Sequence, residues 1–217
     1  MKNLFAWLIW TPLFLSPIKP IQADALHLAP KTLVEITEEK ILTVSIVDSA
    51  GWSIAEIKQA NTADSVTYLS QSEKELYYYL NLVRIAPQKF AKLYLKDLQG
   101  SKDPYKSSLL RELRTLKPMK ALSPERKLFN SAKCHAVESG KRGYTGHNRF
   151  KCEEYFSGEC CSYGLGNAKE IIISLLVDQG VSSLGHRKIC LDQYYSRLGA
   201  SIQPHKSWGV NAVLDFN

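Results

Sequence analysis

Hydrophobic side chains recur every three to four residues over much of the chain after residue 72, and this spacing predicts helices. The first of them is predicted to begin at Ser72-Glu73-Lys74-Glu75, which has the Ser-x-x-Glu form of a capping box. Another is predicted to begin at Ser123-Pro124, a cap followed by proline in the first turn. The predicted helices cover approximately residues 72–86, 88–98, 107–116, 124–140 and 167–178.

Two stretches near the C-terminus have a strand-like pattern instead. Residues 197–202 are mostly apolar, and residues 208–216 alternate between apolar and polar side chains, which predicts two strands. Residues 144–164 follow neither period and are predicted to be irregular. A run of helices followed by two strands predicts an α+β domain in which helices cover a sheet.

The chain before residue 72 has a different character. Residues 33–37 and 41–47 are rich in β-branched side chains and predict a hairpin or two short strands, whereas residues 61–71 are polar and predict a linker. Because a two-stranded unit is not stable alone in water, this β-rich segment is expected to pack on the main domain or on a protein partner. We therefore expect an N-terminal extension with its linker at 26–71 and the main domain at 72–217.

The first 25 residues have the features of a secretory signal peptide. Lys2 precedes an apolar run at 4–15, and Ala23-Asp24-Ala25 is a small-x-small cleavage site. The apolar run is shorter than the roughly 20 residues that cross a bilayer as a helix. We expect a secreted or periplasmic protein without a transmembrane segment in its mature chain, with an uncleaved N-terminal anchor as the alternative.

Composition narrows the function classes. The net charge of +7 is moderately basic, but the sequence has no dense run of Lys and Arg that would follow a phosphate backbone, so nucleic-acid binding is not expected. The chain has five cysteines, namely Cys134, Cys152, Cys160, Cys161 and Cys190. In an oxidising compartment one or two disulfides are expected, and the odd number leaves one thiol free or paired with a partner.

The most informative stretch runs from Asp178 to Lys188. It places a carboxylate at the end of an apolar helix, then a turn rich in Gly and Ser, then His186 behind a glycine. Upstream, Gly146-His147 and Gly158-Glu159 offer a second imidazole and a second carboxylate. Two imidazoles that face one site can bind a divalent ion such as zinc, with carboxylates that either ligate the ion or orient the rings.

The order of these motifs resembles that of the CAP superfamily, the cysteine-rich secretory, antigen 5 and pathogenesis-related proteins, in its bacterial or protist branch. The resemblance covers residues 73–216, and its most specific part is the Asp-x-Gly-Val-x-Ser-x-Gly-His-Arg-Lys run. The motifs that carry it are Asn81 with Arg84, Ala132-x-x-His135-Ala136, Gly146-His147, Gly158-Glu159-Cys160-Cys161, Asp178, Gly185-His186-Arg187-Lys188 and Leu198-Gly199-Ala200.

The resemblance implies a three-layer α-β-α sandwich of CAP type, with a cleft lined by two histidines and two acidic residues. It assigns His147, Glu159 and His186 to three of these positions and places the second acidic residue at Asp178, where the family usually has the longer Glu. It also places Cys160 where the family usually has Asn. His147 and His186 are the metal ligands that it suggests.

Three functions remain open at this point. The first is a non-enzymatic binding module for a lipid, sterol or other small hydrophobic ligand, a cell-wall component or a protein partner. The second is a metal-dependent hydrolase that activates water at His147 and His186. The third is a structural polar network without a ligand. Enzymatic activity is not the favoured reading, because no Gly-x-Ser-x-Gly elbow is present and Cys160 is expected in a disulfide rather than as a nucleophile.

The other polar residues have more ordinary interpretations. His135 shares a helix with Ala132 and Ala136, which favours a packing role over catalysis. His205 is expected in a surface loop. Glu159 has two alternatives to a site role, as a helix cap or as a partner of Arg187, while Arg187 is expected either in solvent or bonded to the carbonyls of the preceding helix.

Overall fold

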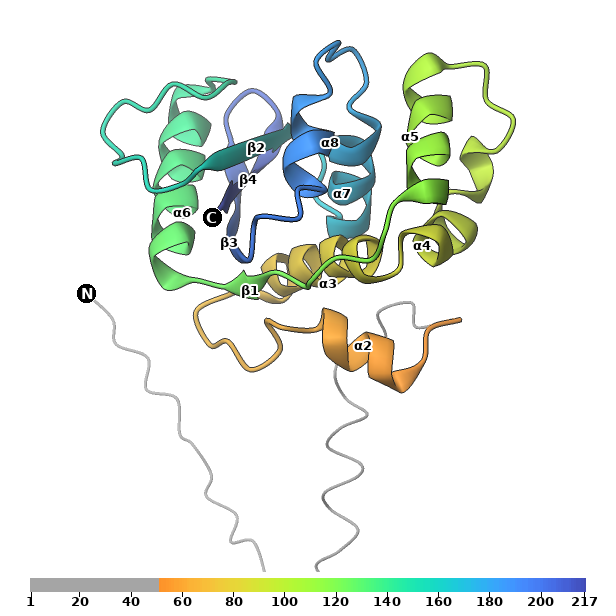
Figure 1. Ribbon diagram of the computed structural model, residues 1–217. Coiled ribbons are helices and arrows are strands. Elements are labelled where there is room, and N and C mark those ends of the chain that lie inside the picture. Colours follow the sequence, from red (N-terminus) through yellow and green to blue (C-terminus); the bar gives the residue numbers. More distant parts are fainter. Residues whose placement is uncertain (1–50) are drawn as a thin grey trace, which may run out of the picture. The chain divides into compact units, whose positions relative to one another are not determined.

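The computed structural model describes residues 51–217, and the strands predicted at 33–47 lie outside these residues. The first elements are helical: α2 (Ile54–Ala60), α3 (Gln71–Ile85), α4 (Pro87–Tyr94), the short 3-10 helix η1 (Lys96–Leu98) and α5 (Pro104–Thr115). The remaining elements are β1 (Ser123–Pro124), α6 (Arg126–Arg142), β2 (Gly158–Tyr163), α7 (Ala168–Val177), α8 (Gly185–Cys190), β3 (Arg197–His205) and β4 (Gly209–Phe216) (Figure 1).

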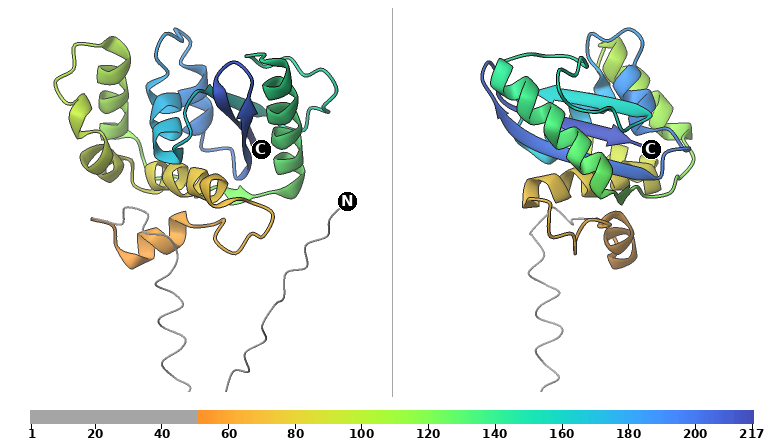
Figure 2. Two further views of the ribbon diagram at one scale, coloured as in Figure 1. Left: turned by 180° about the vertical axis from the view of Figure 1, so that it is seen from behind. Right: turned by 90° about the vertical axis from the view of Figure 1, so that its left-hand side faces the viewer.

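The strands form one mixed sheet in the order β1-β3-β4-β2. The short β1 pairs parallel to β3, whereas β4 pairs antiparallel to both β3 and β2. Helix α6 packs on β3 and β4, and helices α3, α7 and α8 contact the sheet on its other side (Figure 2). The predicted α+β class is therefore confirmed, with helices against both faces of the sheet.

The two faces of the sheet are packed differently. The face toward α3 and α7 carries the main apolar core, which also includes Phe90, Leu113 and Leu176. The face toward α6 has only a small cluster of Ala132, Ala136, Cys161 and Val213. Small side chains let α6 approach closely: a Cβ built at Gly199 would lie 2.0 Å from the backbone carbon of Leu128. This close approach brings the side chains of α6 within reach of the polar groups on β2 and β4.

Buried polar side chains join segments that are distant in sequence. Arg84 is fully buried and donates to the backbone oxygens of Lys120, Cys190, Asp192 and Tyr195. The buried amide of Asn81 donates to the carbonyls of Ala60 and Leu122 and accepts from the Leu122 amide. Each side chain satisfies backbone groups that have no partner in regular structure, so both fix the path of connecting loops.

Several boundaries differ from the sequence prediction. The capping box of α3 is formed by Ser70 and Glu73 rather than by Ser72 and Glu75. The predicted linker at 61–71 packs on the domain, since Ala63 and Leu69 are buried in the main core. Residues 123–124 form the short strand β1 rather than a helix cap. Among residues 51–217, no helix is both long and apolar enough to span a bilayer.

The Gly199 contact gives a test of this packing. We expect Gly199→Ala to lower the free energy of unfolding by about 3 kcal/mol, because the new methyl group overlaps the backbone of α6 and neither element can move without disturbing the other. Gly166→Ala is the matched control, since a Cβ there meets nothing within 4 Å, and its effect should stay within about 0.5 kcal/mol. Urea denaturation of both variants measures the difference, and equal stabilities would contradict the close approach.

Candidate functional site

Asp178 organises one half of the site. It is the C-cap of α7 in the left-handed conformation, with φ of 56°, and its side chain is buried. One carboxylate oxygen lies 2.7 Å from His186 Nδ1, and the other accepts from the His186 backbone amide at 2.9 Å. The same carboxylate therefore caps the first turn of α8 and orients the imidazole of His186, which the shorter side chain of Asp permits.

Arg187 stabilises the turn between Asp178 and His186 through hydrogen bonds to backbone carbonyls. Its guanidinium is almost fully buried and donates to the carbonyls of Leu176 and Val177 at the end of α7 and to the carbonyl of Tyr105 on α5. The expectation that it bonds to the carbonyls of the preceding helix is confirmed. Glu159 is not its partner.

His147 and Glu159 form the other half. The carboxylate of Glu159, on β2, is 3% exposed, and its Oε1 lies 2.8 Å from Nδ1 of His147. The imidazole of His147 itself is 57% exposed. The hydrogen bond to Glu159 raises the pKa of His147 despite its partial burial. Although burial opposes ionisation of Glu159, the bond from His147 and the charge of Arg149 outweigh it and lower the pKa of this carboxyl.

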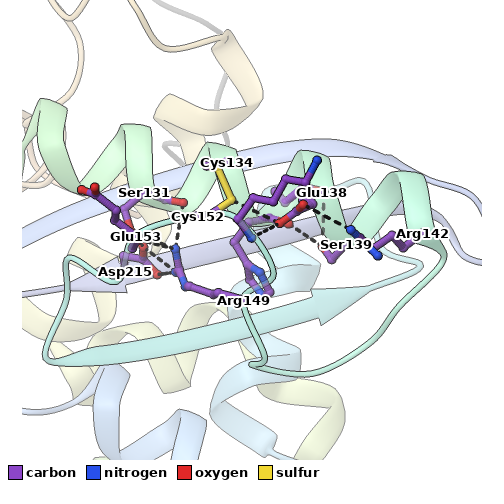
Figure 3. Close-up of a disulfide and its surroundings, with 12 residues drawn as sticks. Ser131, Cys134, Glu138, Ser139, Arg142, Arg149, Cys152, Glu153 and Asp215 are labelled. Carbon is purple, nitrogen blue, oxygen red and sulfur yellow. Dashed lines mark hydrogen bonds and ion pairs between the residues drawn. A yellow bond between two sulfur atoms is a disulfide. The ribbon is translucent and has the colours of Figure 1, made fainter.

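Arg149 is a residue that the sequence analysis missed. Its guanidinium is 2% exposed and contacts Oε2 of Glu159 and both carboxylate oxygens of Asp215, at 3.0 and 2.9 Å. It also donates to the backbone oxygen and hydroxyl of Ser131 on α6, at 3.0 Å each (Figure 3). Arg149 thereby joins the loop after α6 to the sheet and to α6. The one feature of the sequence that points to this buried cluster is Asp215, a charged residue inside the otherwise apolar run 212–216.

Asp215 is the least favourably placed carboxyl of this cluster. It is fully buried, and burial raises its pKa to about 7 even though Ser131 and Arg149 favour its ionised form. The neighbouring charge of Glu159 also raises it. One guanidinium thus serves two carboxyl groups, of which Glu159 holds the negative charge more readily.

The two halves meet at the surface. The ring centroids of His147 and His186 are 6.1 Å apart with an angle of 38° between the ring planes. Both rings use Nδ1 for a buried carboxylate, and no described residue forms a hydrogen bond to Nε2 of either ring. All four residues selected from the sequence are therefore brought together: the His147 side chain is 57% exposed and that of His186 is 21% exposed, and each is bonded to a buried carboxylate.

A second group of potential ligands lies beneath His147. One ligand atom from each of His135, Glu159 and Cys161 falls within 4.8 Å of the others, so this buried group can hold a metal ion. His135 Nε2, however, already lies 3.0 Å from the carbonyl of Gly146, to which it donates. An ion bound through Nε2 would have to displace that hydrogen bond, whereas Nδ1 of the same ring is buried without a hydrogen-bond partner. Nε2 of His147 and of His186 has no hydrogen-bond partner among residues 51–217. The packing role expected for His135 is supported by its complete burial.

The structure also bears on three further expectations. His205 lies in β3 and is buried rather than exposed in a loop, because it bonds to the backbone of Tyr144 and of the turn before β4. Residues 158–163 form β2 rather than irregular structure. Cys160 is a buried free thiol in the structure, and burial raises its pKa well above the ordinary value, which argues against a nucleophilic role.

The disulfide present joins Cys134 on α6 to Cys152 in the following loop (Figure 3). It closes a separation of 18 residues that contains His147 and Arg149. This bridge is in keeping with an extracellular protein, where disulfides persist.

No protein-family model matches this sequence, and the comparison with curated proteins gives no match. The assignment of a function therefore depends on the geometry of the site and on the motifs of the sequence.

The ion pair of His147 gives a prediction about pH. Glu159→Gln should lower the pKa of His147, because the largest cause that raises it is the bond from Glu159. In the wild type, the stabilisation from the protonated pair is fully present below the unfolded pKa of about 6.5 and is lost as the pH rises through the higher folded value. An NMR titration of the imidazole protons measures both proteins. Glu154→Gln, at an exposed position, is the control, and an unchanged pKa in Glu159→Gln would contradict the assignment.

Proposed function

We propose that this protein is an exported, non-enzymatic binding module of the CAP type, with a divalent-ion site at His147 and His186. The proposal rests mainly on one observation. Each imidazole has its Nδ1 held by a buried carboxylate, and neither Nε2 atom has a hydrogen-bond partner among residues 51–217. Metal-binding histidines are typically oriented in this way by an outer carboxylate.

The spacing of the rings suits a transition-metal ion. Two imidazoles that share a zinc ion at about 2.1 Å per nitrogen have ring centroids roughly 5 to 6 Å apart. The observed separation of 6.1 Å is close to this range, so a small rotation of the exposed His147 ring would suffice. Such an ion would supply open coordination positions for a donor group of a ligand.

The chemistry of the same residues favours binding over hydrolysis. Glu159 and Asp178 are buried and already paired with imidazoles, so neither is free to act as a general base on a water molecule. The thiols of Cys160 and Cys161 are buried, and burial raises the pKa of both. The hydrolase alternative would require turnover by the metal-loaded wild type that disappears in His186→Ala.

A separate feature supports a small hydrophobic ligand, such as a lipid or a sterol. A hollow of about 550 Å³ is lined by Leu98, Ile173 and Val177 together with five polar or charged side chains, namely Asp103, Lys106, Glu170, Ser174 and Gln179. Val177 and Gln179 in this lining flank Asp178, so the hollow adjoins the turn that carries the candidate ion site. The volume of this hollow lies in the range of small-ligand sites, which combine apolar side chains with polar groups that orient the ligand.

Membership of the CAP superfamily and secretion belong to the same proposal. The ordered motifs support the family, and the helices on both faces of the sheet are in keeping with it. The predicted signal peptide at 1–25 and the Cys134–Cys152 disulfide support export. A protein partner that binds through residues 26–71 remains a prediction, because most of that segment lies outside the described residues.

Calorimetric titration with zinc tests the ion site. His147→Ala and His186→Ala should each abolish binding, and Asp178→Asn should weaken it by about 10- to 100-fold because the ring loses its orienting charge. His27→Ala, which removes a histidine outside the described residues, should leave the affinity unchanged. Binding that survives both alanine variants but disappears in Cys161→Ser would move the site to the buried His135 group. Absence of binding in the wild type would favour a purely structural network.

A thermal-shift panel of fatty acids and sterols tests the hydrophobic hollow. We expect a stabilising shift with at least one of them, and loss of that shift in Ile173→Glu, because a carboxylate in the apolar lining would have to be desolvated. Lys169→Glu on α7, at a position outside the lining, is the matched control. A wild type that shifts with no member of the panel would contradict a lipid or sterol ligand.

A further inference from the structure

Two of the three free thiols lie between the halves of the candidate site. Cys160 is on β2, directly after Glu159, and Cys190 is the last residue of α8, one helical turn after His186. Both cysteines are completely buried, and both are free in the structure. The strand and the helix that carry them are packed against each other.

The position of the Cys160 sulfur brings it close to Cys190. Its Sγ lies 3.7 Å from the backbone oxygen of His186. In a helix, this carbonyl faces the amide of the residue four positions later, which is Cys190. The Cys160 thiol is therefore next to the turn of α8 that carries Cys190, and, after burial, its interaction with the Cys190 thiol is the next cause that raises the pKa of Cys160.

The third free thiol has different surroundings. Cys161 is the next residue of the strand, so its side chain projects from the opposite face of the sheet. It belongs to the small cluster under α6, and its Sγ lies 3.9 Å from His147 Nδ1. Cys160 and Cys161 therefore cannot both approach α8, and Cys160 is the one that does.

We propose that Cys160 and Cys190 form a second disulfide when the protein matures in an oxidising compartment. The bond would form by exchange with a disulfide oxidant of the glutathione class. The sulfur–sulfur bond forms between Cys160 and Cys190, the bond of the oxidant breaks, and its two sulfurs leave as thiols with the two protons. Because both protein thiols are buried in the folded state, the exchange takes place before α8 has packed on β2.

This bridge would have a direct effect on the site. It would join β2, which carries Glu159, to α8, which carries His186, so the two imidazole–carboxylate pairs would be held together covalently. The inference does not depend on the ion proposed above, since the bridge requires only the proximity of the two thiols.

Counting free thiols tests the proposal. The full-length protein is recovered from an oxidising compartment, denatured without reductant, labelled with N-ethylmaleimide and weighed intact. We expect one label per chain, on Cys161, and a proteolytic peptide pair that joins Cys160 to Cys190. Three labels per chain would overturn the proposal.

Two variants make the assignment specific. Cys161→Ser should carry no label, whereas Cys190→Ser should carry two, on Cys160 and Cys161. Two labels on Cys161→Ser would show that Cys160 and Cys190 remain thiols, which contradicts the proposal. Because the labelling is done on denatured chains, the count does not depend on whether a variant is fully stable. Zinc titration of the folded protein from the same preparations, before denaturation and labelling, reports on the ion site separately, so failure of one inference can be told from failure of the other.

Discussion

The buried guanidinium of Arg149 is the interaction on which the candidate site depends most. It lies between Glu159 on β2 and Asp215 on β4 and also contacts Ser131 on α6, so three elements meet at one charged group. Removal of this cation would leave two buried carboxyl groups without a counter-charge, and breaking a buried pair in this way typically costs 3 to 5 kcal/mol. In the intact protein, the bond from His147 and the charge of Arg149 together keep the Glu159 carboxyl ionised against the effect of its burial.

The two imidazoles are supported in different ways. His186 belongs to a helix whose first turn is capped by the same carboxylate that orients its ring, so the ring and the backbone are fixed together. His147 belongs to a loop and depends on Glu159, on the hydrogen bond between Gly146 and the Tyr163 hydroxyl, and on Arg149 two residues later. The first half of the site is thus built from local chain geometry, and the second from long-range contacts.

This difference explains how much the sequence could predict. The helices and the two C-terminal strands were predicted correctly because their patterns depend on local spacing. The run from Asp178 to His186 was recognised because the helix cap, the turn and the imidazole are close in sequence. Arg149 and the burial of His205 were not found, since both depend on contacts between segments more than ten residues apart. The strand β2 was missed because five of its six residues are buried on both faces and show no alternation.

The covalent ring between Cys134 and Cys152 has a consequence for the response of the protein to proteases. Much of the loop that it encloses is exposed and lacks regular structure, which are the features of a preferred cleavage site for proteases. A chain cut between these two cysteines would nevertheless remain a single covalent molecule, because the bridge spans the cut. Helix α6 and strand β2 would stay covalently joined across the break, so a protein with this bridge can be cut in the loop without separating into two chains.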